Sequence, residues 1–423
     1  MNLFKRSSIY LASNMLNALV PFILLPILTR YLTTAEYGKL AIFQTLIIGL
    51  MAVIGMNTIG AANRKYFDTD KTGLPEYNGV CIHILLISTL VTLILASIFS
   101  NTLMSFLSIP ITWLYGAIII SVGTFLIQLR LGQYQVREMA IRYGVLQVSQ
   151  SCLIFVLTIL FVVILNGNTT GRINAILFGT IICAIISLTL LYKDKLIKIG
   201  RFNQIYFKDA LNYGLPLAPH VIGIFFLSSV DRFFINKILG SSDAGVYMFA
   251  VQISLSIAVL FDALNKALVT SLFAILAENN LEKLNKTVRL TCLFFIVVFI
   301  LGLLSFIIGP LVVELVGGLR FSAASSVIGW LCLGQAFGGM YLMVTNYIFY
   351  AKKTGLLSII TISTGFFNIF LLTFFINYKG IEGVAMAFAI SMFIRFILTW
   401  LLAINVSHFS WLDAFDFKKD IIK

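Results

Sequence analysis

The chain has 423 residues, of which 60% are hydrophobic and 11% charged, with a mean hydropathy of +1.00 and a formal net charge of +13. An average soluble domain has about 25% charged residues, so a water-soluble fold is excluded. Backbone polar groups in lipid must be satisfied internally, by helices or by a closed barrel. Continuous apolar runs such as 84–99 indicate helices rather than the alternating strands of a barrel. The composition therefore predicts an all-α integral membrane protein.

Twelve apolar stretches are each long enough to cross a bilayer, which takes roughly 20 helical residues. In chain order they are 8–29, 39–62, 79–99, 112–131, 143–165, 173–192, 212–239, 244–268, 290–313, 326–350, 356–377 and 381–405. Because twelve is an even number, both termini are expected on the same side of the membrane.

Basic residues gather at the N-terminus, in the even-numbered loops and in the C-terminal tail. They are Lys5, Arg6, Arg64, Lys65, Lys71, Arg137, Arg142, Lys193, Lys195, Lys198, Arg201, Lys208, Lys283, Lys286, Arg289, Lys352, Lys353, Lys418, Lys419 and Lys423. Cytoplasmic loops of membrane proteins carry such an excess. The positive charge thus predicts cytoplasmic termini, and it gives no reason to expect a nucleic-acid partner.

The five cysteines lie inside apolar runs without the spacing of a metal site, and no nucleotide-binding motif is present. We therefore expect no metal, no cofactor and no catalytic residue. The cysteines are Cys81, Cys152, Cys183, Cys292 and Cys332.

A short motif occurs twice, 207 residues apart. The segment 28–38, between the first two predicted spans, matches 235–245, between the seventh and eighth. Each copy has a basic residue, a polar turn, an acid and a glycine, and the acid suits the start of a helix. Six spans separate the copies, which predicts two six-helix halves related by an axis along the membrane normal. The expected divisions are 1–192 and 212–405 for the halves, 193–211 for a cytoplasmic linker and 406–423 for a tail.

At these residues the sequence resembles a known family. The run from Pro21 to Leu32, followed by Glu36-Tyr37-Gly38, is similar to the opening signature of Wzx-type flippases of O-antigen and other lipid-linked oligosaccharides. These are polysaccharide transporters of the multidrug/oligosaccharidyl-lipid/polysaccharide (MOP) superfamily, which also contains the MATE transporters. The run from Asp231 to Ile235 resembles the signature of the family's seventh span.

The resemblance implies a transporter rather than an enzyme. Its substrate would be an undecaprenyl-diphosphate-linked glycan, moved from the cytoplasmic to the outer leaflet of a bacterial inner membrane. The resemblance also implies a role in lipopolysaccharide biosynthesis. The expected partners are a polysaccharide polymerase, chain-length machinery and the lipid bilayer.

Charged side chains inside the spans are the candidate site residues, because a charge at mid-bilayer costs at least about 2.5 kcal/mol. Arg395 has no acid within one turn of its own helix, so it needs a partner elsewhere or an anionic substrate. Arg232, beside Asp231, is expected to meet a diphosphate, although both residues also suit a structural role. Lys266 and Arg30 complete the predicted cationic cavity; Arg30 at a span end also fits simple snorkelling to the interface.

Three further residues are candidates for coupling to protons or sodium: Asp231, Asp262 and His220. Asp262 lies four residues before Lys266, a spacing that more often marks a stabilising helix pair. A histidine within a span is likewise more often a packing residue than a proton carrier.

Two alternatives remain open from the residues alone. A multidrug or cation exporter of the same superfamily would share the fold but would be expected to place acids in its cavity. A membrane-embedded polysaccharide polymerase would be expected to carry a substantial outer loop with catalytic Arg or His, which this chain lacks. The intramembrane charge leans basic, which favours the flippase.

Overall fold

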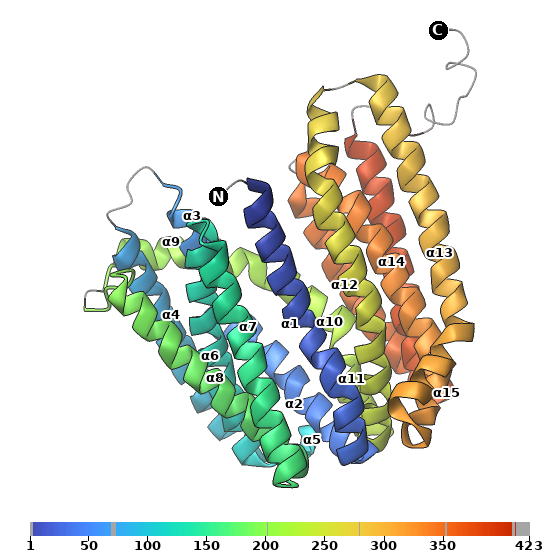
Figure 1. Cartoon of the computed structure of the whole chain (residues 1–423), viewed down its shortest axis with the longest axis horizontal. Helices are drawn as coiled ribbons and strands as arrows, with labels where there is room; N and C mark the ends of the chain where they lie inside the picture. Colours follow the sequence, from blue (N-terminus) through green and yellow to red (C-terminus); the bar gives the residue numbers. More distant parts are fainter. Residues whose placement is uncertain are drawn as a thin grey trace. The chain divides into compact units, whose positions relative to one another are not determined.

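The computed structural model describes residues 3–68, 73–200, 202–278, 280–351, 353–407 and 411. The predicted tail 406–423 falls mostly outside this part of the chain, as do the predicted cytoplasmic cations Lys71, Arg201 and Lys352. The chain forms two compact units: residues 1–225 with 232–248 make unit 1, and 226–231 with 249–423 make unit 2. The described residues of both units are helical, without strands (Figure 1).

Unit 1 contains the helices of the first six predicted spans. They are α1 (Leu3–Tyr31), α2 (Thr34–Val53), α3 (Thr58–Lys65), α4 (Leu74–Ile98), α5 (Ser100–Leu107), α6 (Ile111–Val136), α7 (Ala140–Thr158), the π-helix η1 (Ile159–Ile164) and α8 (Asn168–Lys193). Three core clusters of large apolar side chains hold these helices together; the largest joins α4, α6 and the segment after α8.

The remaining helices begin with α9 (Gln204–Gly214), the 3₁₀ turn η2 (Leu215–Leu217), α10 (Ala218–Ser228) and α11 (Asp231–Ile238). Then follow α12 (Ser241–Glu278), α13 (Leu281–Gly317), the 3₁₀ turn η3 (Leu319–Ala324), α14 (Ser325–Tyr350) and α15 (Thr354–Val406). In unit 2 α14 packs between α13 and α15 (Figure 1).

Eleven helices of the described chain are long and apolar enough to cross a membrane. The last of them, 52 residues long, contains Gly380 with φ +55°, a conformation that breaks a right-handed helix. Segments on both sides of Gly380 are long enough to span a bilayer, so the fold of about twelve transmembrane helices is confirmed.

Two predicted spans are interrupted rather than continuous. The second breaks between α2 and α3, where Gly55 has φ +79° and donates its N–H to Ser88 Oγ at 2.9 Å. The seventh was predicted as 212–239 but starts earlier, at Gln204, and passes through a 3₁₀ turn that contains Pro216. It stops again at Ser228 before α11 begins. Pro216 lacks an N–H, so it interrupts the helical hydrogen bonds at the 3₁₀ turn.

The repeated motif forms a contact with itself inside unit 1. A Cβ on Gly38 would lie 1.8 Å from the carbonyl oxygen of Ser241, and one on Gly245 would lie 1.9 Å from that of Thr34. These contacts are reciprocal: 38 and 245 are equivalent in the repeat, as are 34 and 241. Only glycine allows α2 and α12 to cross this closely. The local contact therefore has the two-fold character that a duplicated motif predicts.

Candidate functional site: buried cations within the spans

Arg395 lies in the second segment of α15 and is only 9% exposed. Its guanidinium carbon lies 3.7 Å from the centroid of the Tyr341 ring on α14. Within the described residues it forms no ion pair with a carboxylate, and its Nε is buried without a hydrogen-bond acceptor. An arginine stacked on a ring keeps the N–H groups along its edge available to bind an anion.

Close packing of α14 against α15 brings these two residues together. Gly334 faces the Phe388 ring, where an added Cβ would lie 2.4 Å from a ring carbon. One turn further, a Cβ on Gly338 would lie 2.9 Å from the terminal methyl of Met392. Small residues at a helix interface permit such an approach, and Tyr341 follows on the same helix. The glycines of α14 thus allow the Tyr341 ring to lie under Arg395.

Asp231 and Arg232 are the first two residues of α11, directly after the interruption of the seventh span. Both are buried, at 3% and 6% exposure. An acid in the first turn is stabilised by the positive end of the helix dipole. In unit 2, Asn368 Nδ2 donates to the carbonyl oxygen of Phe226 at 3.0 Å, in the last turn before the interruption. The predicted charged pair therefore occupies a helix start within a broken span.

Asp262 and Lys266 pair with each other on α12, as their spacing predicts. Lys266 Nζ lies 2.5 Å from Asp262 Oδ2, with both side chains about half exposed. Beside them, Asn346 Nδ2 on α14 donates to Asn265 Oδ1 at 2.7 Å.

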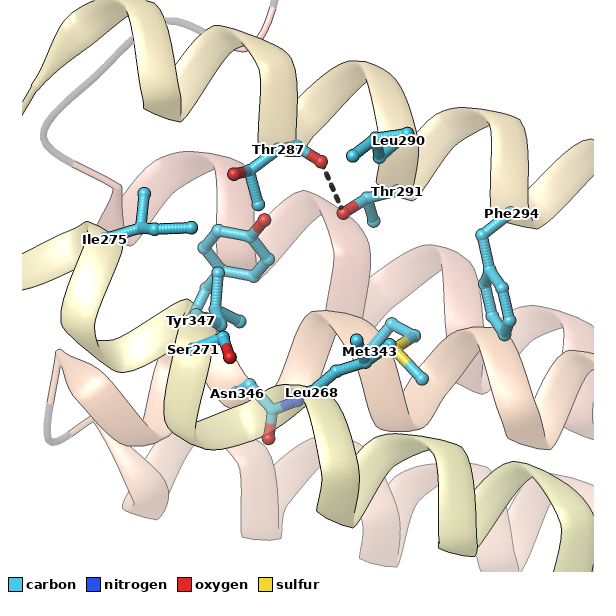
Figure 2. A pocket seen from close by; sticks show the side chains of 11 residues that line it. Leu268, Ser271, Ile275, Thr287, Leu290, Thr291, Phe294, Met343, Asn346 and Tyr347 are labelled. Atoms are coloured by element: carbon cyan, nitrogen blue, oxygen red, sulfur yellow. Dashed lines mark hydrogen bonds between the residues drawn. The ribbon is translucent and has the colours of Figure 1, made fainter.

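A mostly apolar cavity of about 290 Å³ lies between α12, α13 and α14 in unit 2. Figure 2 shows Leu268, Thr291 and Tyr347 among the side chains that point into it. The Thr291 hydroxyl donates to the Thr287 carbonyl at 2.9 Å, so its hydrogen-bond donor is already satisfied within α13 (Figure 2).

The remaining two predicted site residues, Arg30 and His220, are less buried than Arg395 and Arg232. Arg30 is exposed at the end of α1, and His220 is partly buried in the first turn of α10. In the described part of the chain Arg395 contacts Tyr341 rather than another predicted cavity residue.

Sequence reasoning missed a further buried arginine, Arg130 on α6, which is 1% exposed. Its Nη2 forms an ion pair with Asp194 Oδ2, and its guanidinium carbon lies 3.9 Å from the centroid of the Tyr134 ring. Tyr134 is four residues further along α6, a spacing that places two side chains on one helix face. That spacing was a usable signal, whereas Asp194 is too distant in sequence to have been paired with Arg130.

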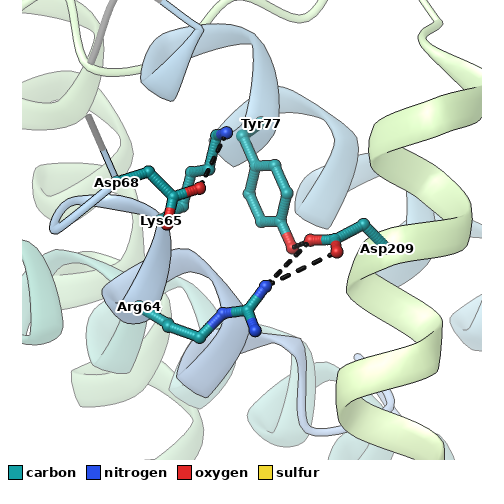
Figure 3. Close-up of polar contacts among 5 residues, drawn as sticks. All are labelled: Arg64, Lys65, Asp68, Tyr77 and Asp209. Carbon is teal, nitrogen blue, oxygen red and sulfur yellow. Dashed lines mark hydrogen bonds and ion pairs between the residues drawn. The ribbon is translucent and has the colours of Figure 1, made fainter. Parts of the chain in front are cut away.

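A polar cluster also went unpredicted at the attachment of α9 to α3 and α4 (Figure 3). Tyr77 donates to Asp209 Oδ2 at 2.7 Å, and Arg64 Nη2 lies 3.5 Å from the same carboxylate. Lys65 donates to Asp68 at 3.0 Å, and this hydrogen bond raises the pKa of Lys65. These contacts hold α9, where the seventh span begins, against α3 and α4.

The comparisons with known proteins decide the family. A family model described as a polysaccharide biosynthesis protein matches residues 3–275. The chain belongs to that family. A Haemophilus influenzae protein of the Lsg locus is 28% identical over 399 residues, which cover 90% of this chain and 95% of that protein.

Two solved structures show the fold. The lipid II flippase MurJ in an inward closed conformation has a TM-score of 0.72 at 14% identity, covering 99% of this chain and 100% of MurJ. A multidrug resistance MATE family transporter of the MOP superfamily, in an inward-facing conformation, has a TM-score of 0.68 at 20% identity and covers 92% and 94%. The family member described here is a multi-pass membrane protein with a MATE- and MurJ-like fold.

Proposed function

We propose that this protein flips undecaprenyl-diphosphate-linked oligosaccharide units from the cytoplasmic to the outer leaflet of a bacterial inner membrane. The polysaccharide biosynthesis family supplies the glycan context. The fold is shared with MurJ, a lipid II flippase by its name. The observation that carries the proposal is the buried Arg395, whose partner is a tyrosine ring and not a carboxylate.

A diphosphate crossing hydrocarbon would pay a large desolvation cost unless cations meet it. In the proposal Arg395 and Arg232 bind the diphosphate, with Lys266 and Arg30 as further cations along the path. The sugar hydroxyls need a hydrated route, whereas the polyprenyl tail is as apolar as the bilayer and remains in it. The chain therefore needs to carry only the polar headgroup.

The movement we propose is alternating access between the halves 1–192 and 212–405, with both termini cytoplasmic. Both the second and the seventh span are interrupted, and such broken helices supply points where a transporter bends. Asp231, Asp262 and His220 are the proposed sites for coupling to protons or sodium. The flipped unit would then pass to a polymerase and chain-length machinery that build O-antigen or a related polysaccharide.

Export of cationic drugs is the second candidate, because the fold is also that of a multidrug resistance transporter. Binding a cation inside the membrane calls for an unpaired acid. Asp262, the acid inside the eighth predicted span, is instead paired with Lys266, which favours the anionic substrate.

The test is a strain lacking this gene, from which undecaprenyl-linked oligosaccharides are recovered and assigned to a leaflet. We expect single repeat units on the cytoplasmic face, relieved when the gene is restored. Single units on the outer face would indicate a polymerase or ligase. A normal glycan pattern together with raised drug sensitivity would contradict the flippase proposal and support drug export instead.

A further inference from the structure

A cleft in unit 1 opens between the ends of α6, α7 and α8 and has a volume of about 520 Å³. Tyr134 lines it from α6, Arg142 and Ser149 from α7, and Asp194 from the end of α8. The basic loops of the sequence gather at this end of the spans. Nothing in the proposed transport of glycans uses these residues.

The walls of the cleft open toward lipid. Ile141, Val145 and Ile186 line it and are 60%, 62% and 45% exposed. Apolar side chains exposed on a membrane-spanning helix face acyl chains rather than water. A ligand of this cleft therefore comes from the bilayer and brings an apolar portion with it.

Two opposite charges face the cleft. Arg142 is exposed and has no carboxylate partner among the described residues. Asp194 uses Oδ2 for its ion pair with Arg130, and its side chain remains 39% exposed. The second oxygen, Oδ1, accepts no hydrogen bond in the described part of the chain. The cleft thus offers one guanidinium donor and one carboxylate acceptor.

Arg130 fixes the carboxylate without itself reaching the cleft. It is 1% exposed, stacked on Tyr134, and its Nε and Nη1 lack acceptors within the described residues. Removing the one acid that pairs with a buried cation strongly destabilises the fold. The ion pair with Arg130 therefore holds the Asp194 carboxylate in place at the end of α8.

We infer that this cleft binds the headgroup of phosphatidylethanolamine. The lipid phosphate meets the Arg142 guanidinium, and the ethanolamine ammonium donates to Asp194 Oδ1. The glycerol and upper acyl carbons pack on Ile141, Val145 and Ile186. Basic residues in pockets between transmembrane helices bind phosphate-bearing lipid headgroups. The carboxylate in this cleft selects a headgroup that also carries an ammonium. The inference is independent of the glycan that the protein transports.

The experiment is native mass spectrometry of the full-length protein in detergent, titrated with dioleoyl-phosphatidylethanolamine or dioleoyl-phosphatidylglycerol. The wild type is expected to bind one phosphatidylethanolamine about tenfold more tightly than phosphatidylglycerol. Arg142→Ala is expected to weaken phosphatidylethanolamine by about tenfold, because it removes a charge-assisted hydrogen bond. Lys193→Ala, an exposed cation next to Asp194 that does not line the cleft, is the matched control and should bind like the wild type.

Asp194→Asn alone would leave Arg130 buried without its acid, so the carboxylate is tested in the double variant Arg130→Met with Asp194→Asn. This variant is expected to fold and to bind the two lipids equally. Inorganic phosphate at millimolar concentration should not displace the lipid. Equal binding of both lipids by the wild type, full affinity in Arg142→Ala, or displacement by phosphate alone would each overturn the assignment.

Discussion

Two of the buried arginines, one in each unit, stack on tyrosine rings, but only one of the two is paired with a carboxylate among the described residues. Arg130 lies 3.9 Å from a tyrosine ring in unit 1, and Arg395 lies 3.7 Å from one in unit 2. Arg130 also has a carboxylate, Asp194, whereas Arg395 forms no ion pair in the described chain. A paired buried charge stabilises a particular packing, while an unpaired one is retained at a cost in stability. The difference favours a structural role for Arg130 and supports the proposed anion binding by Arg395.

The largest expected effect is on transport by Arg395→Ala. Losing a charge-assisted contact with a buried diphosphate costs about 2–5 kcal/mol, which is enough to abolish glycan export in cells. Thermal unfolding should be unchanged or shifted upward, because a desolvated charge has been removed. Surface glycan and melting temperature are the two readouts. Lys283→Ala, whose side chain is exposed and paired with Glu278, is the control; loss of export there too would remove the special role of Arg395.

Arg130→Ala is expected to show the reverse pattern. Breaking a buried pair costs about 3–5 kcal/mol, and the lower end applies because Asp194 is partly exposed. The melting temperature should fall clearly, whereas transport per folded molecule should persist. Arg130→Met combined with Asp194→Asn should recover much of the stability. A transport defect in this double variant at normal folded levels would contradict the structural assignment.

Gly38→Ala sharpens the comparison by testing the contact that the repeat makes with itself. A Cβ would lie 1.8 Å from a backbone carbonyl, so α2 and α12 must separate. Overpacking of this kind costs about 1–3 kcal/mol. Gly116→Ala on α6 meets nothing within 4 Å and is the matched control. Equal unfolding temperatures for the two variants would show that the close crossing does not matter.

Lys266→Ala should have the smallest effect on stability. Its ion pair with Asp262 is half exposed, and exposed pairs contribute about 0.2–1 kcal/mol. Export should fall less than in Arg395→Ala, since the remaining cavity arginines are intact. A defect as complete as that of Arg395→Ala would place Lys266 directly on the diphosphate.

The sequence predicted the span count because long apolar stretches are set by bilayer thickness, a local property. It also predicted the Asp262–Lys266 pair, since both residues lie on one helix face. It placed Arg395 in a span but could not name Tyr341, because that contact depends on how α14 and α15 pack. Arg130 was missed for the same reason: Asp194 is 64 residues away. The start of the seventh span at Gln204 was missed because α9 is held by contacts with α3 and α4.

The central claim, that this protein moves a lipid-linked anion, is tested most directly in reconstituted vesicles. Purified wild-type protein and Arg395→Ala are placed in liposomes with labelled undecaprenyl-diphosphate-linked oligosaccharide, and the accessible fraction is followed with a membrane-impermeant glycosidase. We expect wild-type vesicles to equilibrate the label between leaflets, and Arg395→Ala vesicles to retain it like protein-free liposomes. Retention by the wild type, or equal movement by both proteins, would contradict the claim.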